Sequence, residues 1–180
     1  MRKFFIRNLP SSDTVKRNRW LRPFSAWLYH PNLWHLHRRS VAGGVATGLF
    51  CGLVPGPLQM ISSALLAVLF RVNLPVALIT TLYTNPFTIV PLYLLAYRIG
   101  VWLSGAHRGG AVSAPPFPDM HWNDFIGKMW GWMAALGEPL LIGLPVLGAS
   151  LAIAGYIAVR VGWRVAVIIK WRARKRRYDV

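Results

Sequence analysis

The sequence predicts an all-α polytopic membrane protein, with a broken or re-entrant helical hairpin, two further membrane-crossing segments and an interfacial helix. Three observations predict this class. Of the 180 residues, 54% are hydrophobic and only 14% are charged, with a mean hydropathy of +0.39. The net charge of +16 comes from cations gathered mainly at the two chain ends, whereas a soluble nucleic-acid-binding domain interleaves its cations with polar residues. Three long runs carry no formal charge: Arg39 to Arg71, Arg71 to Arg98, and Glu138 to Arg160, end residues excluded.

The basic residues divide the chain into regions and orient it. We expect a basic and aromatic N-terminal region at 1–40, a membrane domain at 41–160 with an outer loop at 104–138, and a polybasic tail at 161–180. Because cytoplasmic loops carry the excess of Lys and Arg, both termini are predicted to be cytoplasmic. The basic ends are expected to lie on anionic lipid headgroups. No nucleic-acid partner is expected.

The first charge-free run is interrupted near its middle by Pro55-Gly56-Pro57. As helices, Val41–Val54 and Leu58–Phe70 would each reach about 20 Å, short of a hydrocarbon core of ~30 Å. Proline removes a backbone donor and glycine permits a tight turn, so the interruption favours the tip of a re-entrant hairpin. Arg71 would then return to the cytoplasmic surface. A single tilted or kinked crossing is the alternative.

The second run is interrupted at Asn85-Pro86, between the flanks Leu74–Thr84 and Phe87–Leu103. We expect this run to cross outward, with Arg98 near the outer surface, and the third run, Pro139–Val159, to return inward. The number of complete crossings is then even, as two cytoplasmic termini require. An aromatic segment ahead of the third run is expected to lie along the outer leaflet. Its apolar residues are Trp122, Phe125, Met129, Trp130, Trp132 and Met133.

Glycines recur at a four-residue interval in and just after the first half-helix, at Gly44, Gly48, Gly52 and Gly56. On a helix this interval places them along one face, where the absence of side chains lets another helix approach closely. We interpret these four residues as a helix-packing seam. The sequence does not identify the helix that packs against it.

Polar side chains accompany both interruptions. Gln59, Ser62 and Ser63 share one face of the second half-helix, and Thr80, Thr84 and Thr88 follow in the next run. Two interrupted segments in succession are typical of a substrate site at the membrane midplane. Alternatively, the same polar side chains can form hydrogen bonds that hold neighbouring helices together. The arginines that border the second run suit lipid phosphate or plain interfacial anchoring. The candidate substrate-binding residues are Pro55, Gly56, Pro57, Gln59, Thr84, Asn85, Pro86, Thr88, Arg71 and Arg98.

The sequence lacks the residues and motifs that several classes of chemistry require. No Asp, Glu, Lys or His lies within the runs, so a buried proton relay has no carrier. No catalytic triad, nucleophile elbow, Walker motif or dinucleotide-binding glycine pattern is present. We therefore expect no enzyme, no catalytic residue, no cofactor and no metal site.

The motifs also resemble a known family. The stretches Pro55-Gly56-Pro57-x-Gln59, Arg71-Val72-Asn73-x-Pro75, Thr84-Asn85-Pro86-x-Thr88 and Tyr97-Arg98-Ile99-Gly100 are similar to the bacterial membrane family catalogued as domain of unknown function 2062. The resemblance covers roughly residues 25–160. It implies a protein of the bacterial inner membrane and brings no established activity.

Residues and resemblance together predict a non-enzymatic inner-membrane protein that handles an anionic, lipid-like substrate in the manner of a small transporter. The alternative is a structural subunit or scaffold of an envelope complex. Because a bundle this small encloses little by itself, a homo-oligomer is expected.

Overall fold

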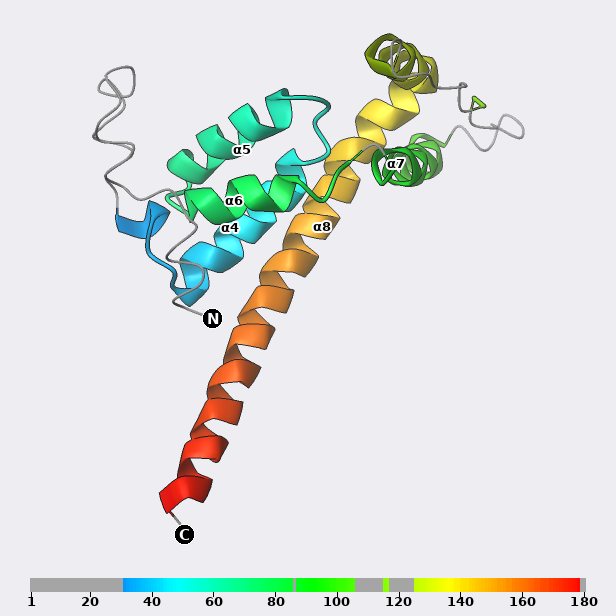
Figure 1. The fold of residues 1–180 in the computed structure, drawn as a ribbon. Coiled ribbons are helices and arrows are strands. Elements are labelled where there is room, and N and C mark those ends of the chain that lie inside the picture. Colours follow the sequence, from blue (N-terminus) through cyan, green and yellow to red (C-terminus); the bar gives the residue numbers. More distant parts are fainter. Residues whose placement is uncertain (1–30, 86, 106–114, 117–124, 179–180) are drawn as a thin grey trace, which may run out of the picture. The chain divides into compact units, whose positions relative to one another are not determined.

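A computed structural model of the chain describes residues 31–85, 87–105, 115–116 and 125–178. Within these residues the regular structure is entirely helical, in agreement with the predicted all-α class (Figure 1). The elements in chain order are the 3-10 helix η2 (Pro31–Leu33), α4 (Arg38–Cys51), α5 (Leu58–Leu69), α6 (Leu74–Thr81), α7 (Ile89–Ser104) and α8 (Phe125–Tyr178).

The chain divides into two compact units. Unit 1 comprises residues 1–83 and 151–180, and unit 2 comprises residues 84–150. The boundary between Tyr83 and Thr84 falls inside the second charge-free run, so α6 belongs to unit 1 and α7 to unit 2. Residues 1–30 of the predicted basic N-terminal region lie outside the described residues, as do residues 106–114 and 117–124 of the predicted outer loop, Trp122 among them.

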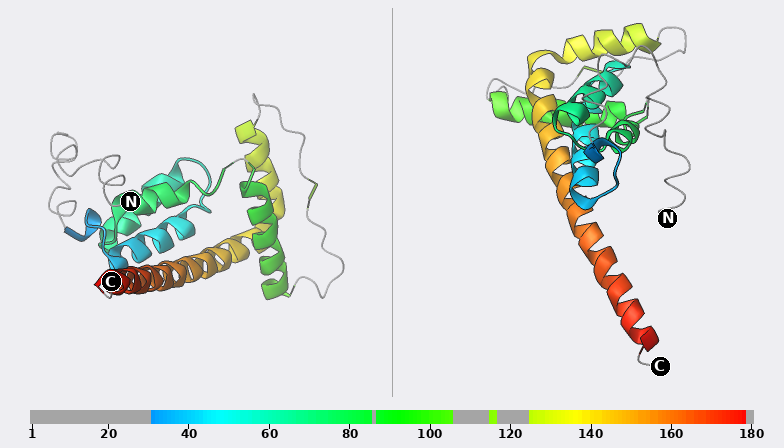
Figure 2. Two further views of the ribbon diagram at one scale, coloured as in Figure 1. Left: turned by 60° about the horizontal axis from the view of Figure 1, so that its bottom comes forward. Right: turned by 90° about the vertical axis from the view of Figure 1, so that its left-hand side faces the viewer.

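In unit 1, α4 and α5 are separated by a turn where the sequence predicts an interruption. Gly56 in this turn has a φ of 68°, a conformation that glycine adopts without steric cost. The N–H of Gln59 donates to the Gly56 carbonyl at 3.3 Å. The two helices contact each other, and both contact α6 (Figure 2). The predicted helix break is therefore confirmed, and it folds the two helices together as a hairpin.

The start of α6 is fastened to the beginning of α4 by Asn73. Its side chain caps α6 by accepting a hydrogen bond from the Val76 N–H at 3.0 Å. Its own backbone N–H donates to the Ser40 carbonyl at 3.1 Å, and its side-chain amide donates to the His35 carbonyl at 3.4 Å. Asn73 is fully buried, so these bonds satisfy polar groups that water does not reach. The connection between α5 and α6 thus lies at the N-terminal end of α4.

In unit 2, α7 packs closely on the adjoining part of α8. A Cβ atom on Gly100 would collide with the Pro139 carbonyl, and one on Gly143 would collide with the Ala96 carbonyl. Both glycines therefore let two helix backbones approach each other. The indole N–H of Trp132 donates to the Pro115 carbonyl at 3.2 Å.

The helix α8 is interrupted once, at Gly137, whose φ of 59° and ψ of −148° are not helical. The helix changes direction at this residue (Figure 2). A helical segment ahead of the third run is therefore present, as predicted. The interruption is made by Gly137, because only glycine adopts this backbone conformation without strain.

The third run is part of a longer helix than the sequence indicates. Pro139 and Pro145 lie inside α8, and the helix continues beyond the predicted end at Val159 as far as Tyr178. The apolar run ends at Arg160, but the residues that follow contain no proline and many good helix formers, so the helix outlasts the apolar run. By length and composition, α8 is the one helix in the described residues that is able to cross a membrane. The helices α5 and α7 are apolar but shorter.

Candidate functional site

The predicted glycine seam lies against α6. A Cβ on Gly44 would lie 2.7 Å from the Asn73 carbonyl oxygen, and one on Gly48 would lie 2.6 Å from the Thr80 Cβ. A Cβ on Gly52 would collide with the ring of Tyr83. The hydroxyl of this tyrosine donates to the Leu49 carbonyl at 2.8 Å. These separations leave no room for a side chain, so the seam sets how closely α4 and α6 approach.

Gly56 does not share this seam. It lies in the turn after α4, and nothing outside its chain neighbours lies within 4 Å of the Cβ that it would carry. Because α4 ends at Cys51, the four-residue spacing from Gly52 does not place Gly56 on the same helical face. The positive φ of Gly56 explains this glycine instead.

The polar residues of the first interruption lie on α5. The Ser62 hydroxyl donates to the Gln59 carbonyl at 3.1 Å, and Gln59 itself is half-buried. Ser63 is fully buried, and its hydroxyl has no hydrogen-bond partner in the described part of the chain. An unsatisfied buried hydroxyl costs about 1–3 kcal/mol, so Ser63 is a local weakness of this hairpin.

The polar residues of the second interruption form a local turn. The Asn85 side-chain oxygen accepts hydrogen bonds from the Phe87 N–H at 2.9 Å and the Thr88 N–H at 3.0 Å. The Thr88 hydroxyl in return accepts from the Asn85 N–H at 2.9 Å. Pro86 lies outside the described residues. Asparagine and threonine commonly satisfy backbone groups in this way at helix starts.

The predicted threonine face does not run along one helix. The helix α6 ends at Thr81, before Thr84 is reached, and Thr88 lies at the start of α7. Thr80 and Thr81 donate to carbonyls of their own helix, at 2.7 Å each. Because Asn85 and Thr88 build a turn of their own, the four-residue interval does not carry one helical face across the interruption.

The candidate substrate-binding residues therefore divide between the two units. Pro55, Gly56, Pro57, Gln59 and Arg71 belong to unit 1. Thr84, Asn85, Thr88 and Arg98 belong to unit 2, where Arg98 is exposed on α7. Unit 1 contains a second candidate site within its own bounds, which the sequence alone does not indicate.

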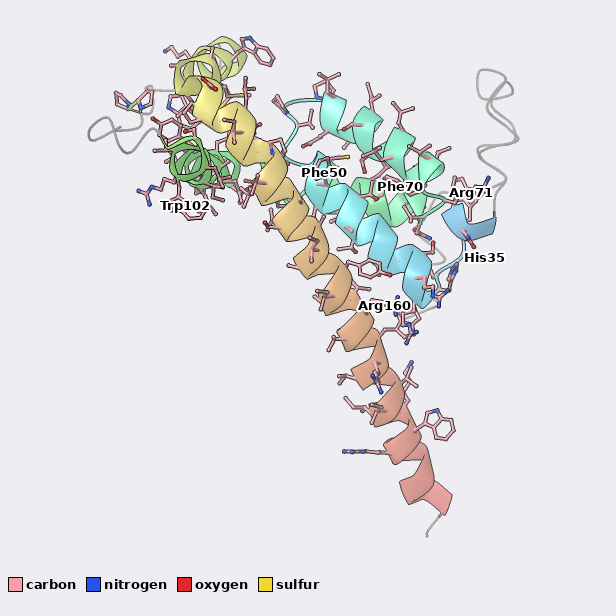
Figure 3. All side chains as sticks on the ribbon, turned by 180° about the vertical axis from the view of Figure 1, so that it is seen from behind. His35, Phe50, Phe70, Arg71, Trp102 and Arg160 are labelled. Carbon is pink, nitrogen blue, oxygen red and sulfur yellow. The ribbon has the colours of Figure 1, made fainter. Side chains whose placement is uncertain are left out.

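Arg71 occupies an unusual backbone position at the end of α5. The Val72 N–H donates to the Ala67 carbonyl at 2.9 Å and the Arg71 N–H donates to the Val68 carbonyl at 3.1 Å, the two bonds of a Schellman motif. In this motif the residue with positive φ is usually glycine, and here it is Arg71, with a φ of 53°. A left-handed conformation costs a residue with a side chain about 1–2 kcal/mol. The Arg71 side chain is exposed (Figure 3).

The end of unit 1 that carries Arg71 is strongly basic. A Cβ on Gly43 would lie 3.1 Å from the Val72 Cβ, so Arg71 is close to the first turns of α4, where Arg38 and Arg39 are exposed. Among the described residues, unit 1 contains no Asp and no Glu. A negative partner for these arginines must therefore come from elsewhere in the chain or from another molecule.

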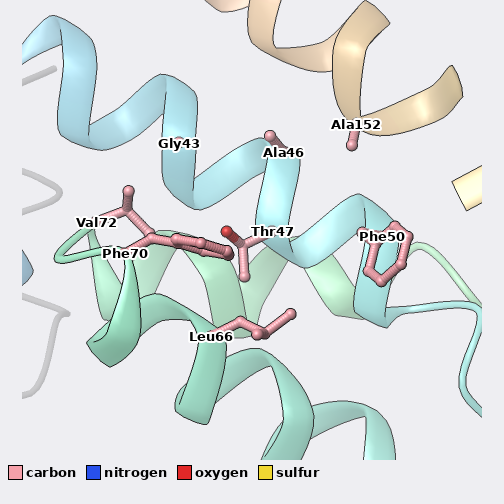
Figure 4. A pocket seen from close by; sticks show the side chains of 8 residues that line it. All are labelled: Gly43, Ala46, Thr47, Phe50, Leu66, Phe70, Val72 and Ala152. Carbon is pink, nitrogen blue, oxygen red and sulfur yellow. The ribbon is translucent and has the colours of Figure 1, made fainter. Parts of the chain in front are cut away.

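A cavity of about 400 Å³ is lined mainly by residues of α4, of α5 and of the connection that follows α5, and Ala152 of α8 also contributes to its lining (Figure 4). We call it the α4–α5 groove. Thr47 is its one side chain with a polar atom. Its lining residues are Gly43, Ala46, Thr47, Phe50, Leu66, Phe70, Val72 and Ala152.

The groove leads toward the basic end of unit 1. Gly43, Thr47 and Phe50 lie on the same face of α4 as Arg39, at intervals of three and four residues. On the other wall, Arg71 stands between the lining residues Phe70 and Val72. An apolar space with an arginine close by along the chain on each of two walls can hold a hydrocarbon chain and pair with an anion beside it.

Sequence reasoning identified Arg71 but missed the groove. The spacing of small residues next to Arg39 on one face of α4 was the available signal. The far wall could not be found in this way, because Leu66 and Ala152 are 86 residues apart in the chain. The described residues contain no group of three or more His, Cys, Asp or Glu side chains that could hold a metal ion.

Comparisons with known proteins assign the chain to a family. No significant match was found among curated proteins or among solved structures. The family model described as "Uncharacterized protein conserved in bacteria (DUF2062)" matches residues 21–172, which is most of the chain. The resemblance noted in the spaced Pro, Asn, Gln and Gly motifs is confirmed, and the chain belongs to this bacterial family.

Proposed function

We propose that the protein is a multi-pass protein of the bacterial inner membrane that binds and moves an anionic, lipid-like substrate, with both termini in the cytoplasm. One observation carries the proposal. In unit 1 an apolar groove leads to exposed arginines, and the described residues of that unit include no acidic side chain. This combination suits a molecule with a hydrocarbon part and a negative headgroup.

The lengths of the helices support a re-entrant hairpin. With 14 and 12 residues, α4 and α5 reach about 21 and 18 Å, both short of a hydrocarbon core of ~30 Å. The outer face of α5 exposes Leu58, Ile61, Leu65 and Leu69, an apolar stripe that suits lipid contact. The arginines lie at one end of the hairpin and Gly56 lies in the turn at the other end. We place the basic end at the cytoplasmic surface and the turn inside the bilayer.

A topology experiment tests this placement. In a Cys51→Ala background, single cysteines are introduced as His37→Cys and Arg71→Cys, and intact spheroplasts are treated with a membrane-impermeant maleimide. A re-entrant hairpin leaves both positions unlabelled until the cells are opened, because both face the cytoplasm. Labelling of Arg71→Cys but not His37→Cys in intact spheroplasts would instead show that residues 38–70 cross the membrane.

A transport experiment tests the activity. The protein is reconstituted into vesicles that contain phosphatidylglycerol with a fluorescent nitrobenzoxadiazole label, and dithionite is added outside. We expect the label of the inner leaflet to become accessible faster than in protein-free vesicles, and faster than with labelled phosphatidylcholine. Equal rates with and without protein would contradict transport of this lipid class.

A scaffold is the second candidate, and α8 favours it. Every residue from 161 to 172 is exposed, including Trp163, Ile169 and Trp171. Large exposed apolar side chains among cations are typical of a surface that binds a partner or a lipid layer. Deletion of residues 161–180 distinguishes the two functions. A scaffold loses its partner in a pull-down from solubilised membranes, whereas a transporter keeps most of its activity in vesicles.

A further inference from the structure

We propose that the α4–α5 groove holds one acyl chain of an anionic phospholipid, with the lipid phosphate paired to Arg39 and Arg71. This inference rests on the proposed membrane function and names the substrate class of the site. The occupant is a phospholipid from the surrounding bilayer.

The walls of the groove fit a hydrocarbon chain. The volume of about 400 Å³ falls within the range of ~300–1,000 Å³ that is usual for ligand pockets. Ala46 and Ala152 contribute only small side chains to the lining, and Phe50 and Phe70 supply large apolar surfaces. A polar ligand would lose its hydrogen bonds to water here with almost nothing in exchange, whereas an acyl chain has none to lose.

The rim of the groove fits a phosphate. Arg39 lies one helical turn before the lining residue Gly43, and Arg71 follows Phe70 directly. Guanidinium groups form paired hydrogen bonds to phosphate oxygens and remain charged at all physiological pH values. The described residues of unit 1 contain no carboxylate that could pair with these arginines in place of a phosphate.

The backbone of Arg71 is a separate observation that favours a role for its side chain. With a φ of 53°, this residue occupies a position where glycine would be less strained. Strained residues that persist are often found at ligand sites. We therefore expect that replacing Arg71 by glycine relieves the backbone while removing lipid binding.

The exposed face of α5 provides the route of entry. Leu65 and Leu69 are exposed directly beside the lining residues Leu66 and Phe70. A lipid chain in the bilayer would pass from this apolar face into the groove without crossing a polar surface. Free inorganic phosphate would gain nothing from the apolar walls, so the source of the anion is a lipid.

Native mass spectrometry of the full chain tests the site. The protein is purified in mild detergent, stripped of lipid and titrated with four probes. These are palmitoyl-oleoyl phosphatidylglycerol, phosphatidylcholine with the same chains, dihexanoyl phosphatidylglycerol and inorganic phosphate. We expect one tightly retained palmitoyl-oleoyl phosphatidylglycerol and at least fivefold weaker retention of the other three. Equal retention of phosphatidylcholine would overturn the role of the arginines, and equal retention of either probe without long chains would overturn the role of the groove.

Three variants locate the binding residues. Arg71→Gly and Arg39→Gln should each weaken phosphatidylglycerol binding about fivefold, the usual effect of one cation near an anionic lipid. Ala46→Phe keeps both charges, fills the groove and should reduce retention of the long-chain lipid alone. The control is Arg172→Gln, which removes an exposed arginine of α8 that lies 20 residues beyond the lining residue Ala152 and should leave binding unchanged.

Thermal unfolding of the lipid-free variants separates a binding defect from a folding defect. Arg71→Gly should melt at or above the temperature of the wild-type protein, because the strain at φ 53° is relieved. Normal phosphatidylglycerol binding by a stably folded Arg71→Gly would overturn the proposal. So would a loss of binding in Arg172→Gln equal to that in Arg71→Gly.

The two proposals fail in different ways. If the site is correct and transport is not, mass spectrometry shows the bound lipid while the vesicles show no accelerated dithionite reaction. If transport occurs without this site, the vesicle rate is high in both Ala46→Phe and Arg71→Gly, and no lipid is selectively retained.

Discussion

The two interruptions of the chain look alike in the sequence, but the structure builds them differently. At Pro55-Gly56-Pro57 the turn has no side-chain cap on the following helix, and its flanking helices pack together with α6 in one unit. At Asn85 a side chain caps the backbone at Phe87 and Thr88, and the flanking helices fall in different units.

A proline therefore marks where a helix stops, but it does not decide how the two flanking helices pack. The helices beside the first turn are held by the glycines of α4, which lie against α6. Around the second turn, hydrogen bonds within four residues define the chain path. The first interruption therefore depends on tertiary packing, and the second is largely local.

The largest effect is expected when a side chain is added to a glycine of the seam, where α4 packs against α6 beside the first interruption. Gly48→Ala places a Cβ 2.6 Å from the Thr80 Cβ and closer still to the Ala77 carbonyl, so α4 and α6 must separate. We expect the free energy of unfolding to fall by about 1–3 kcal/mol, measured by thermal or denaturant unfolding in mild detergent.

The matched control is Gly131→Ala, an identical change in a helix where nothing lies within 4 Å of the new Cβ. There the better helix propensity of alanine should raise stability by about 0.5–1 kcal/mol. Similar effects in both variants would show that the seam does not hold the helices together.

A smaller and graded effect is expected from the two capping asparagines. Asn73→Ala should cost about 2 kcal/mol, because it removes the cap of α6 and, from a fully buried position, the side-chain bond to the His35 carbonyl. Asn85→Ala should cost about 1 kcal/mol or less, because its cap is exposed to solvent.

Hydrogen exchange shows how far along the chain each asparagine substitution destabilises the structure. Asn85→Ala should speed exchange of the Phe87 and Thr88 amides alone. Asn73→Ala should speed exchange throughout α6 and at the start of α4. Exchange confined to the Val76 amide in Asn73→Ala would contradict a tertiary role for this residue.

The smallest effect is expected at Ser63 and has the opposite sign. Its hydroxyl is buried without a hydrogen-bond partner in the described residues, so Ser63→Ala should raise the unfolding free energy by up to about 1 kcal/mol. Ser62→Ala is the control and should lower it slightly, since that hydroxyl donates to the Gln59 carbonyl. Destabilisation by Ser63→Ala would reveal a polar partner for this hydroxyl and make the first interruption a polar site.

Much of the fold was predictable because its signals are local. Proline and glycine interrupt helices through their own backbone chemistry, so the breaks after Cys51 and after Thr81 could be read from neighbouring residues. The end of α8 could not be predicted from hydropathy, because the helix continues through charged residues that form helices equally well. The candidate site was predicted only at Arg71, since a groove needs walls from distant parts of the chain.

The helical class, the positions of the interruptions, the glycine face of α4 and the family follow from the order of the residues. Only the folded chain shows that α6 packs on that face, that Gly56 is a turn residue, and that Phe70 and Val72, the neighbours of Arg71, line one apolar groove with α4. The physical reason is the range of the interactions. Backbone propensity and charge depend on a few neighbouring residues, whereas close packing joins residues as far apart as Gly43 and Ala152.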